Sequence, residues 1–204
     1  DGRADEERPV GEAGHGVAQQ IRAPMKQHAP LVRLLAALVV FSLVYLALFT
    51  NAKMESTAME PAIAAGDYLL VCRASYGVRL PLAGEVARTG RPAREDIVLI
   101  EKGRHDAEKI VAVLRIVGLP GEVVSITDKR VSIDGQLLEE GYATFSDDRV
   151  YPEALSARDN MAALVVPEDA FFVMADRRDT ATDSRFFGTV SRNEIVGRAL
   201  LVYW

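Results

Sequence analysis

The sequence predicts a mostly β protein, in which an antiparallel β domain follows a single N-terminal transmembrane helix. Residues 31–49 are apolar and carry one charge, Arg33. Past residue 65 the apolar residues come in short β-branched runs, and turn-forming residues separate these runs. We therefore expect a disordered cytoplasmic tail over residues 1–30, a transmembrane helix over residues 31–49, and one extracytoplasmic domain over residues 50–204.

The apolar stretch is long enough to cross a bilayer. About 20 helical residues span a hydrocarbon core of about 30 Å, and the Arg33 side chain can reach back to the headgroups. A cleaved signal peptide is the alternative, but its apolar region is normally about 7 to 15 residues long. Arg22, Lys26 and Arg33 precede the helix with no acid between residues 13 and 33. This charge bias predicts a cytoplasmic N-terminus and a single-pass protein of the inner membrane.

Composition excludes several classes of site. The net charge is -5, and the basic residues after residue 50 are scattered among acids, so nucleic acid is not an expected partner. Cys72 is the single cysteine, so it cannot form an internal disulfide. No Cys/His cluster with ligand spacing is present, and we expect neither a metal nor a cofactor.

The β prediction depends on short runs past residue 65. They cover residues 68–71, 97–100, 110–117, 123–126, 131–133, 163–166, 171–174 and 199–203. Turn residues around Asp128 and at Asp134-Gly135 separate three consecutive segments, so residues 123–138 are expected to form a β-meander. Residues 79–96 and 139–162 combine Pro, Gly and charge without periodicity, and we interpret both as surface excursions. No long helix is expected after residue 50.

Three segments place Gly, Pro and polar residues beside these runs, and we call them the first, second and third box. They are Ser56-Thr57-Ala58-Met59-Glu60-Pro61, Leu114-Arg115-Ile116-Val117-Gly118-Leu119-Pro120-Gly121-Glu122, and Ala175-Asp176-Arg177-Arg178-Asp179-Thr180-Ala181-Thr182-Asp183-Ser184-Arg185-Phe186-Phe187-Gly188. Over about residues 34–204 the chain resembles the type I signal peptidases, membrane-bound serine proteases that remove signal peptides from exported proteins. The resemblance implies a β-rich extracytoplasmic domain with a serine nucleophile and a lysine general base.

The catalytic positions implied by the resemblance carry apolar residues. Ala58 stands where the family has its nucleophilic serine, and Leu114 where it has the base lysine. Ala181 stands where the family has a serine that orients the lysine. Alanine and leucine supply neither an attacking oxygen nor a proton acceptor, so these positions cannot hydrolyse an amide.

Neighbouring residues do not replace the missing groups. Ser56 resembles the family serine that contributes to the oxyanion hole, and it lies about 6.5 Å along an extended chain from position 58, whereas attack requires about 3 to 3.5 Å. Lys109 is five positions before Leu114, which on a strand places it on the opposite face and about 16 Å away. His105 is further along the chain, and His15 and His28 lie on the other side of the membrane.

The resemblance also implies which residues bind the peptide and which residues support the site. An extended signal-peptide end would lie between residues 52–57 and residues 111–113. The binding residues would be Ala52, Ser56, Thr57, Val111, Ala112 and Val113, and the charged residues that support the site would be Arg115, Asp176, Asp183 and Arg185. We interpret these charges as structural pairs.

The sequence therefore predicts a signal peptidase-like pseudoenzyme. We expect a membrane protein that binds or scaffolds exported precursors, such as signal peptides or pilin-like precursors, or a secretion or pilus assembly. Two alternatives remain: an active endopeptidase with a relocated catalytic group, and a structural subunit whose site-side surface is covered by a partner.

Overall fold

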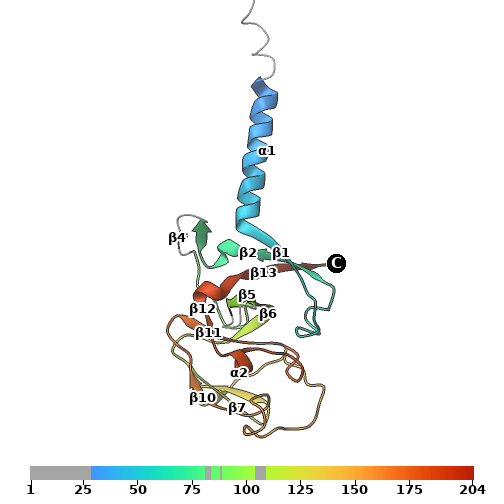
Figure 1. The fold of residues 1–204 in the computed structure, drawn as a ribbon, viewed down its shortest axis with the longest axis vertical. Coiled ribbons are helices and arrows are strands. Elements are labelled where there is room, and N and C mark those ends of the chain that lie inside the picture. The colour runs from blue at the N-terminus through green and yellow to red at the C-terminus, as the bar shows by residue number, and fades with distance from the viewer. Residues whose placement is uncertain (1–28, 81–83, 88, 104–108) are drawn as a thin grey trace, which may run out of the picture. The chain divides into compact units, whose positions relative to one another are not determined.

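The computed structural model describes residues 29–80, 84–87, 89–103 and 109–204 of the chain (Figure 1). The predicted tail over residues 1–30 lies outside this part, apart from its last two residues. His15, His28 and His105 also lie outside it.

The first element is the helix α1, Ala29–Leu48, which is 20 residues long and has no buried residue. Its length and composition suffice to cross a membrane. It begins two residues before the predicted start at residue 31 and ends one residue before the predicted end at Phe49. Phe49 instead begins strand β1 because its backbone pairs with Cys72, while its ring stacks on Tyr45 at 5.3 Å. The chain divides into two compact units, one ending at Val44 and one covering Tyr45–Trp204.

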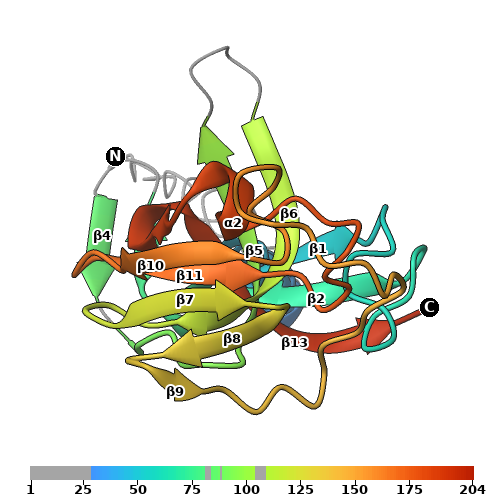
Figure 2. The same cartoon turned by 90° about the horizontal axis from the view of Figure 1, so that it is seen from below.

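The second unit is an antiparallel β domain, as the sequence predicts. Its main sheet has seven strands in the order β1-β2-β13-β5-β6-β11-β12 (Figure 2). The bounds are β1 Phe49–Lys53, β2 Tyr68–Cys72, β5 Ile97–Gly103, β6 Lys109–Gly118, β11 Ala170–Met174, β12 Val190–Ser191 and β13 Ile195–Tyr203. Every strand pairing in this sheet is antiparallel.

A second sheet contains the predicted meander. Its order is β10-β7-β8-β9, and its strands are β7 Val123–Thr127, β8 Arg130–Ile133, β9 Gln136–Leu137 and β10 Met161–Val165. Asp128, Lys129 and Asp134 adopt positive φ angles at its tight turns. The prediction for residues 123–138 is therefore confirmed.

The structure corrects two expectations. Residues 79–96 are not wholly irregular, because β3, Val78–Leu80, pairs with β4, Gly84–Ala87, as a separate ribbon. The third box includes a short helix, α2, Ser184–Phe187, which the sequence did not predict. The other elements are the 3₁₀ helices η1, Arg73–Ser75, and η2, Arg192–Glu194. Among the described residues no long helix follows residue 50, as expected.

Strands β5 and β6 are buried on both faces, which places the second box in the middle of the domain. Val98 and Ile100 of β5 belong to one buried cluster with Leu114 and Ile116 of β6. The alternate residues Leu99 and Val113 belong to another, together with Met54, Met59, Ile63, Leu69 and Val71. Successive side chains of a strand point to opposite faces, so a residue of β6 that faces one cluster cannot face the other.

One glycine allows strands β13 and β2 to approach each other closely. A Cβ atom on Gly197 would lie 2.3 Å from the carbonyl oxygen of Cys72 and 3.0 Å from the Cα atom of Arg73. The register between β13 and β5 also shifts at this residue. Any side chain here would therefore displace backbone rather than a flexible side chain.

We predict that Gly197→Ala lowers the free energy of unfolding by about 1 to 3 kcal/mol, because the new methyl group overpacks a backbone contact. The measurement is denaturant unfolding of the detergent-solubilised chain followed by circular dichroism. Gly141→Ala is the control, since a Cβ atom on Gly141 meets nothing within 4 Å. Equal unfolding midpoints for the two variants would show that the approach at Gly197 is not tight.

Candidate functional site

The three boxes meet at one open groove on the β domain. The groove has a volume of about 630 Å³. The described residues that line it are Asn51, Ala52, Lys53, Met54, Glu55, Ser56, Thr57, Ala58, Leu99, Val111, Ala112, Val113, Leu114, Thr180, Ala181 and Thr182. All six residues that the sequence analysis assigned to binding are in this list, and so are Ala58, Leu114 and Ala181. The tertiary structure therefore brings together residues that are far apart in the chain.

We call Ala58, Leu114 and Ala181 the floor of the groove. All three are apolar, where the resemblance implies polar groups. Leu114 is 1% exposed and belongs to the buried cluster around Ile116 and Val173. Ala58 and Ala181 are half-buried and pack against the same cluster. The three side chains are thus part of the hydrophobic core as well as of the groove.

The serine and the lysine that line the groove, Ser56 and Lys53, are both exposed. Ser56 is exposed, and its hydroxyl accepts a hydrogen bond from the backbone N–H of Ala58 at 3.4 Å. Lys109 lies outside the groove, where its ammonium pairs with Glu101. The sequence analysis gave no catalytic role to Lys53, which lies within its predicted binding segment 52–57; its ammonium is 5.8 Å from the centre of the Tyr68 ring. An exposed lysine lacks the burial that activates this side chain as a general base.

Two strand edges border the groove. Strand β1 is the first strand of the main sheet, and within the described part of the chain it pairs with β2 alone. Strand β6 pairs with β5 along Lys109–Arg115, but β11 reaches it only from Arg115 to Gly118. Among the described residues, nothing pairs with the other edge of β6 before Arg115. An extended peptide could therefore hydrogen-bond to either edge.

Hydrogen bonds next to the three apolar positions hold the boxes together. The side chain of Arg115 donates to both carboxylate oxygens of Asp176, at 2.8 and 2.6 Å. The backbone N–H of Arg177 donates to the carbonyl oxygen of Ala58 at 2.8 Å, and its guanidinium pairs with Glu60 at 3.2 Å. The contact of Arg115 with Asp176 links the second box to the third. The contacts of Arg177 with Ala58 and Glu60 link the third box to the first.

Two buried arginines support the third box from inside. Asp183 accepts from the Arg185 guanidinium at 2.8 Å and from the backbone N–H of Ala175 at 3.1 Å. Arg178 pairs with Glu140, and its Nε donates to the carbonyl oxygen of Ala175. Of the four charged residues that the resemblance assigns to support of the site, Arg115 thus contacts Asp176, and Arg185 contacts Asp183. The sequence analysis missed Arg178, because its partner Glu140 is distant in the chain.

Asp179 ties a long loop to the third box. Its carboxylate accepts from the backbone N–H groups of Ser146 and Asp147, and it pairs with Lys129 at 3.1 Å. Burial alone would raise the pKa of Asp179, but these donors and the ammonium of Lys129 bring the pKa below its usual value. The pairing orders the backbone that leads directly to Thr180, Ala181 and Thr182 in the groove.

Leu99 and Asn51 are groove residues that the sequence analysis did not name, and Thr180 and Thr182, which it named only as members of the third box, line the groove as well. Thr180 and Thr182 flank Ala181, so adjacency was a usable signal for them. Leu99 reaches the groove from the neighbouring strand β5, which only the strand pairing reveals. Within the described part of the chain, no group of three or more His, Cys, Asp or Glu side chains could hold a metal ion.

Comparison with known proteins shows similarity to signal peptidases. A family model described as "Signal peptidase, peptidase S26" matches residues 27–204. A signal peptidase I of Leptolyngbya laminosa is 32% identical over 157 residues, which cover 74% of this chain and 66% of that protein. A signal peptidase I of Pseudomonas fluorescens is 32% identical over 182 residues, covering 74% of this chain and 63% of that protein. The chain thus spans about two thirds of the length of these curated relatives.

A solved structure is also similar. It is a signal peptidase I from Enterococcus faecalis, with 26% sequence identity and a TM-score of 0.42. The match covers 54% of this chain and 97% of that one.

We predict that acid destabilises the domain through Asp179. The folded chain holds the pKa of Asp179 below its unfolded value, so this stabilisation is present above about pH 4 and is lost as the pH falls through the folded pKa. Asp179→Asn should lower the thermal midpoint at pH 7 and reduce the slope of stability against pH below pH 4. The measurement is thermal unfolding of the detergent-solubilised chain at a series of pH values.

The exposed residue Asp148 provides the matched control, since its replacement by Asn should leave both the midpoint and the slope nearly unchanged. A wild-type slope in Asp179→Asn would contradict the assignment of the acid dependence to this carboxylate.

Proposed function

The chain belongs to the signal peptidase family, peptidase S26, and from this membership we propose that it binds exported precursors at a membrane without cleaving them. The observation that carries the proposal is the combination at the groove. Ala58, Leu114 and Ala181 line it together and are all apolar, while the charged pairs around them are intact. The groove and the charged pairs support the proposed binding, and the apolar residues at the three matching positions support the proposed absence of cleavage.

The apolar residue at position 114 is consistent with the energetic cost of burying a charge. A lysine at position 114 without an acceptor would be a buried charge, and leucine removes that cost. Leu114 instead packs with Ile116 and Val173 in the core. The three apolar replacements therefore favour a stable domain with no hydrolytic step, rather than a damaged enzyme.

The open edges of β1 and β6 support peptide binding. A guest strand between them would satisfy backbone N–H and C=O groups that have no partner strand among the described residues. Its alternate side chains would contact the apolar floor at Ala58, Leu114 and Ala181. Affinity would come mainly from the backbone, and selectivity from the small space above the floor.

The helix supports a membrane location for this binding. Strand β1 begins at Phe49, directly after α1, and Ala58 is ten residues past Leu48. A groove so close in sequence to a membrane-crossing helix would meet clients that are themselves tethered to the membrane. We place α1 in the inner membrane with the N-terminus in the cytoplasm, and the clients as signal peptides, pilin-like precursors or subunits of a secretion assembly.

The first test measures binding. We predict that the full chain in detergent binds a signal-peptide or pilin-precursor peptide, and that Val111→Asp weakens the affinity about tenfold. The reason is that a carboxylate replaces an aliphatic contact at the groove. Isothermal titration calorimetry provides the dissociation constants.

Val165→Asp is the matched control for that experiment. Val165 is 64% exposed and Val111 is 65% exposed, and both are strand residues, but Val165 belongs to β10 of the second sheet. Its replacement should leave the affinity unchanged. Absence of binding at millimolar peptide would reject precursor capture.

The second test introduces a serine, a lysine and a second serine at the three apolar positions. We predict that the triple variant Ala58→Ser, Leu114→Lys and Ala181→Ser cleaves a precursor, because a buried lysine next to a serine can accept its proton. Gel electrophoresis of a precursor incubated with the purified chain detects the product. The double variant Leu114→Lys and Ala181→Ser, which has no nucleophile at position 58, should remain inactive.

The same assay examines the alternative of a relocated catalytic group. Cleavage by the unmodified chain that Ser56→Ala abolishes would contradict the proposal and identify Ser56 as a nucleophile. Inactivity of a correctly folded triple variant would show that the groove no longer has the geometry that hydrolysis requires.

A further inference from the structure

The backbone of strand β1 shows which of its residues face a peptide in the groove. The backbone N–H of Met54 donates to the carbonyl oxygen of Asp67 at 2.8 Å, and the carbonyl oxygen of Met54 accepts from the backbone N–H of Gly66 at 2.7 Å. In an antiparallel pair, both backbone polar groups of one residue point to the same neighbouring strand, and those of the next residue point the other way. The backbone groups of Lys53 and Glu55 therefore point away from β2, toward the open edge.

The side chains of Lys53 and Glu55 lie on the exposed face of the same segment. Side chains two residues apart on an extended chain point to one face, and the side chain between them points to the other. Lys53 and Glu55 are exposed, whereas Met54 between them is 4% exposed and belongs to the buried cluster of Leu99 and Val113. A base and an acid thus stand two residues apart at the open edge, opposite an apolar cluster.

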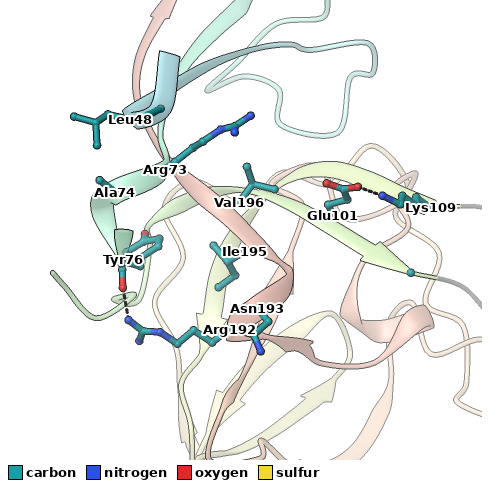
Figure 3. A pocket seen from close by; sticks show the side chains of 13 residues that line it. Leu48, Arg73, Ala74, Tyr76, Glu101, Lys109, Arg192, Asn193, Ile195 and Val196 are labelled. Atoms are coloured by element: carbon teal, nitrogen blue, oxygen red, sulfur yellow. Dashed lines mark hydrogen bonds and ion pairs between the residues drawn. The ribbon is translucent and has the colours of Figure 1, made fainter. Parts of the chain in front are cut away.

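These two charges are available to a guest peptide. They are the charged residues of the described groove lining, and among the described residues neither Lys53 nor Glu55 forms an ion pair. The ammonium of Lys53 lies 5.8 Å from the centre of the Tyr68 ring, and a neutral ring leaves the charge in place. By contrast, Lys109 and Glu101 on β6 and β5 pair with each other in a separate cavity (Figure 3).

We propose that Lys53 and Glu55 select peptides by charge, so that the groove prefers an extended segment with an acid and a base two residues apart and an apolar residue between them. A guest strand on the open edge of β1 would place one side chain beside Lys53 and the next but one beside Glu55. The residue between them would point to the face on which Met54 is buried. This inference rests on the proposed binding of peptides in the groove and adds what the peptide must carry.

The order of the two charges in the preferred peptide reports the direction of the guest strand. A guest antiparallel to β1 passes Glu55 before Lys53, so its base precedes its acid, and a parallel guest carries the charges in the opposite order. Strands β1 and β6 run in the same direction, because four antiparallel pairings through β2, β13 and β5 connect them. A guest between the two edges therefore has the same direction relative to both.

The experiment compares three synthetic peptides by isothermal titration calorimetry with the full chain in detergent. The peptides share one exported-precursor segment and differ in three central residues, which are lysine-alanine-glutamate, glutamate-alanine-lysine or glutamine-alanine-glutamine. One charged peptide should bind about fivefold more tightly than the neutral one, since opposite charges on neighbouring strands attract, and the reverse order should bring no gain. High salt should reduce the difference, because exposed charges are screened.

A charge exchange in the chain tests the assignment to these two residues. The double variant Lys53→Glu and Glu55→Lys should reverse the preference between the two charged peptides. The ratio of their affinities is taken within one variant, so a general loss of affinity does not imitate a reversal. Arg130→Glu with Glu139→Lys is the matched control, because it exchanges a base and an acid at exposed positions outside the groove lining and should keep the original preference.

The outcomes separate this inference from the proposed function. Equal affinities of the unmodified chain for all three peptides would overturn selection by charge and leave precursor binding intact. An unchanged preference after the exchange of Lys53 and Glu55, or a reversal in the control variant, would overturn the inference as well. Absence of binding of every peptide would instead reject the proposed function and this inference with it.

Discussion

The paired contact of Arg115 with Asp176 is the interaction on which the groove depends. Both hydrogen bonds are short, the Asp176 side chain is fully buried and that of Arg115 is 11% exposed. Charges buried in this way require a partner, because each alone would lose its hydration without compensation. Since Arg115 follows Leu114 and Asp176 precedes Arg177, the pair joins the strand that carries one floor residue to the segment that bonds Ala58. Among the described residues, no buried side-chain polar atom lacks a hydrogen-bond partner.

The charged pairs and the apolar floor of the groove are compatible for a physical reason. The charged pairs are not part of the groove lining, and because their members satisfy one another they do not require the floor to be polar. Leu114 packs into the core on the side where a lysine would need an acceptor. The proposed binding function accordingly requires the groove and the charged pairs, but no polar side chain at the floor. The presence of the charged pairs next to an apolar floor is the basis of the proposed binding function.

The sequence by itself determined the local features. The apolar stretch predicted α1, the short runs predicted most strands of the two larger sheets, and the turn residues predicted the meander of β7, β8 and β9. The sequence also places Ala58, Leu114 and Ala181 at the positions where the resemblance implies a serine, a lysine and a second serine. Such features depend on residues that are close in the chain. The tertiary structure alone decided which distant residues meet: Leu99 in the groove, Lys109 with Glu101, and Asp179 with the loop at Ser146. These contacts follow from strand order and register, and a shift of one residue in register would turn every side chain to the opposite face.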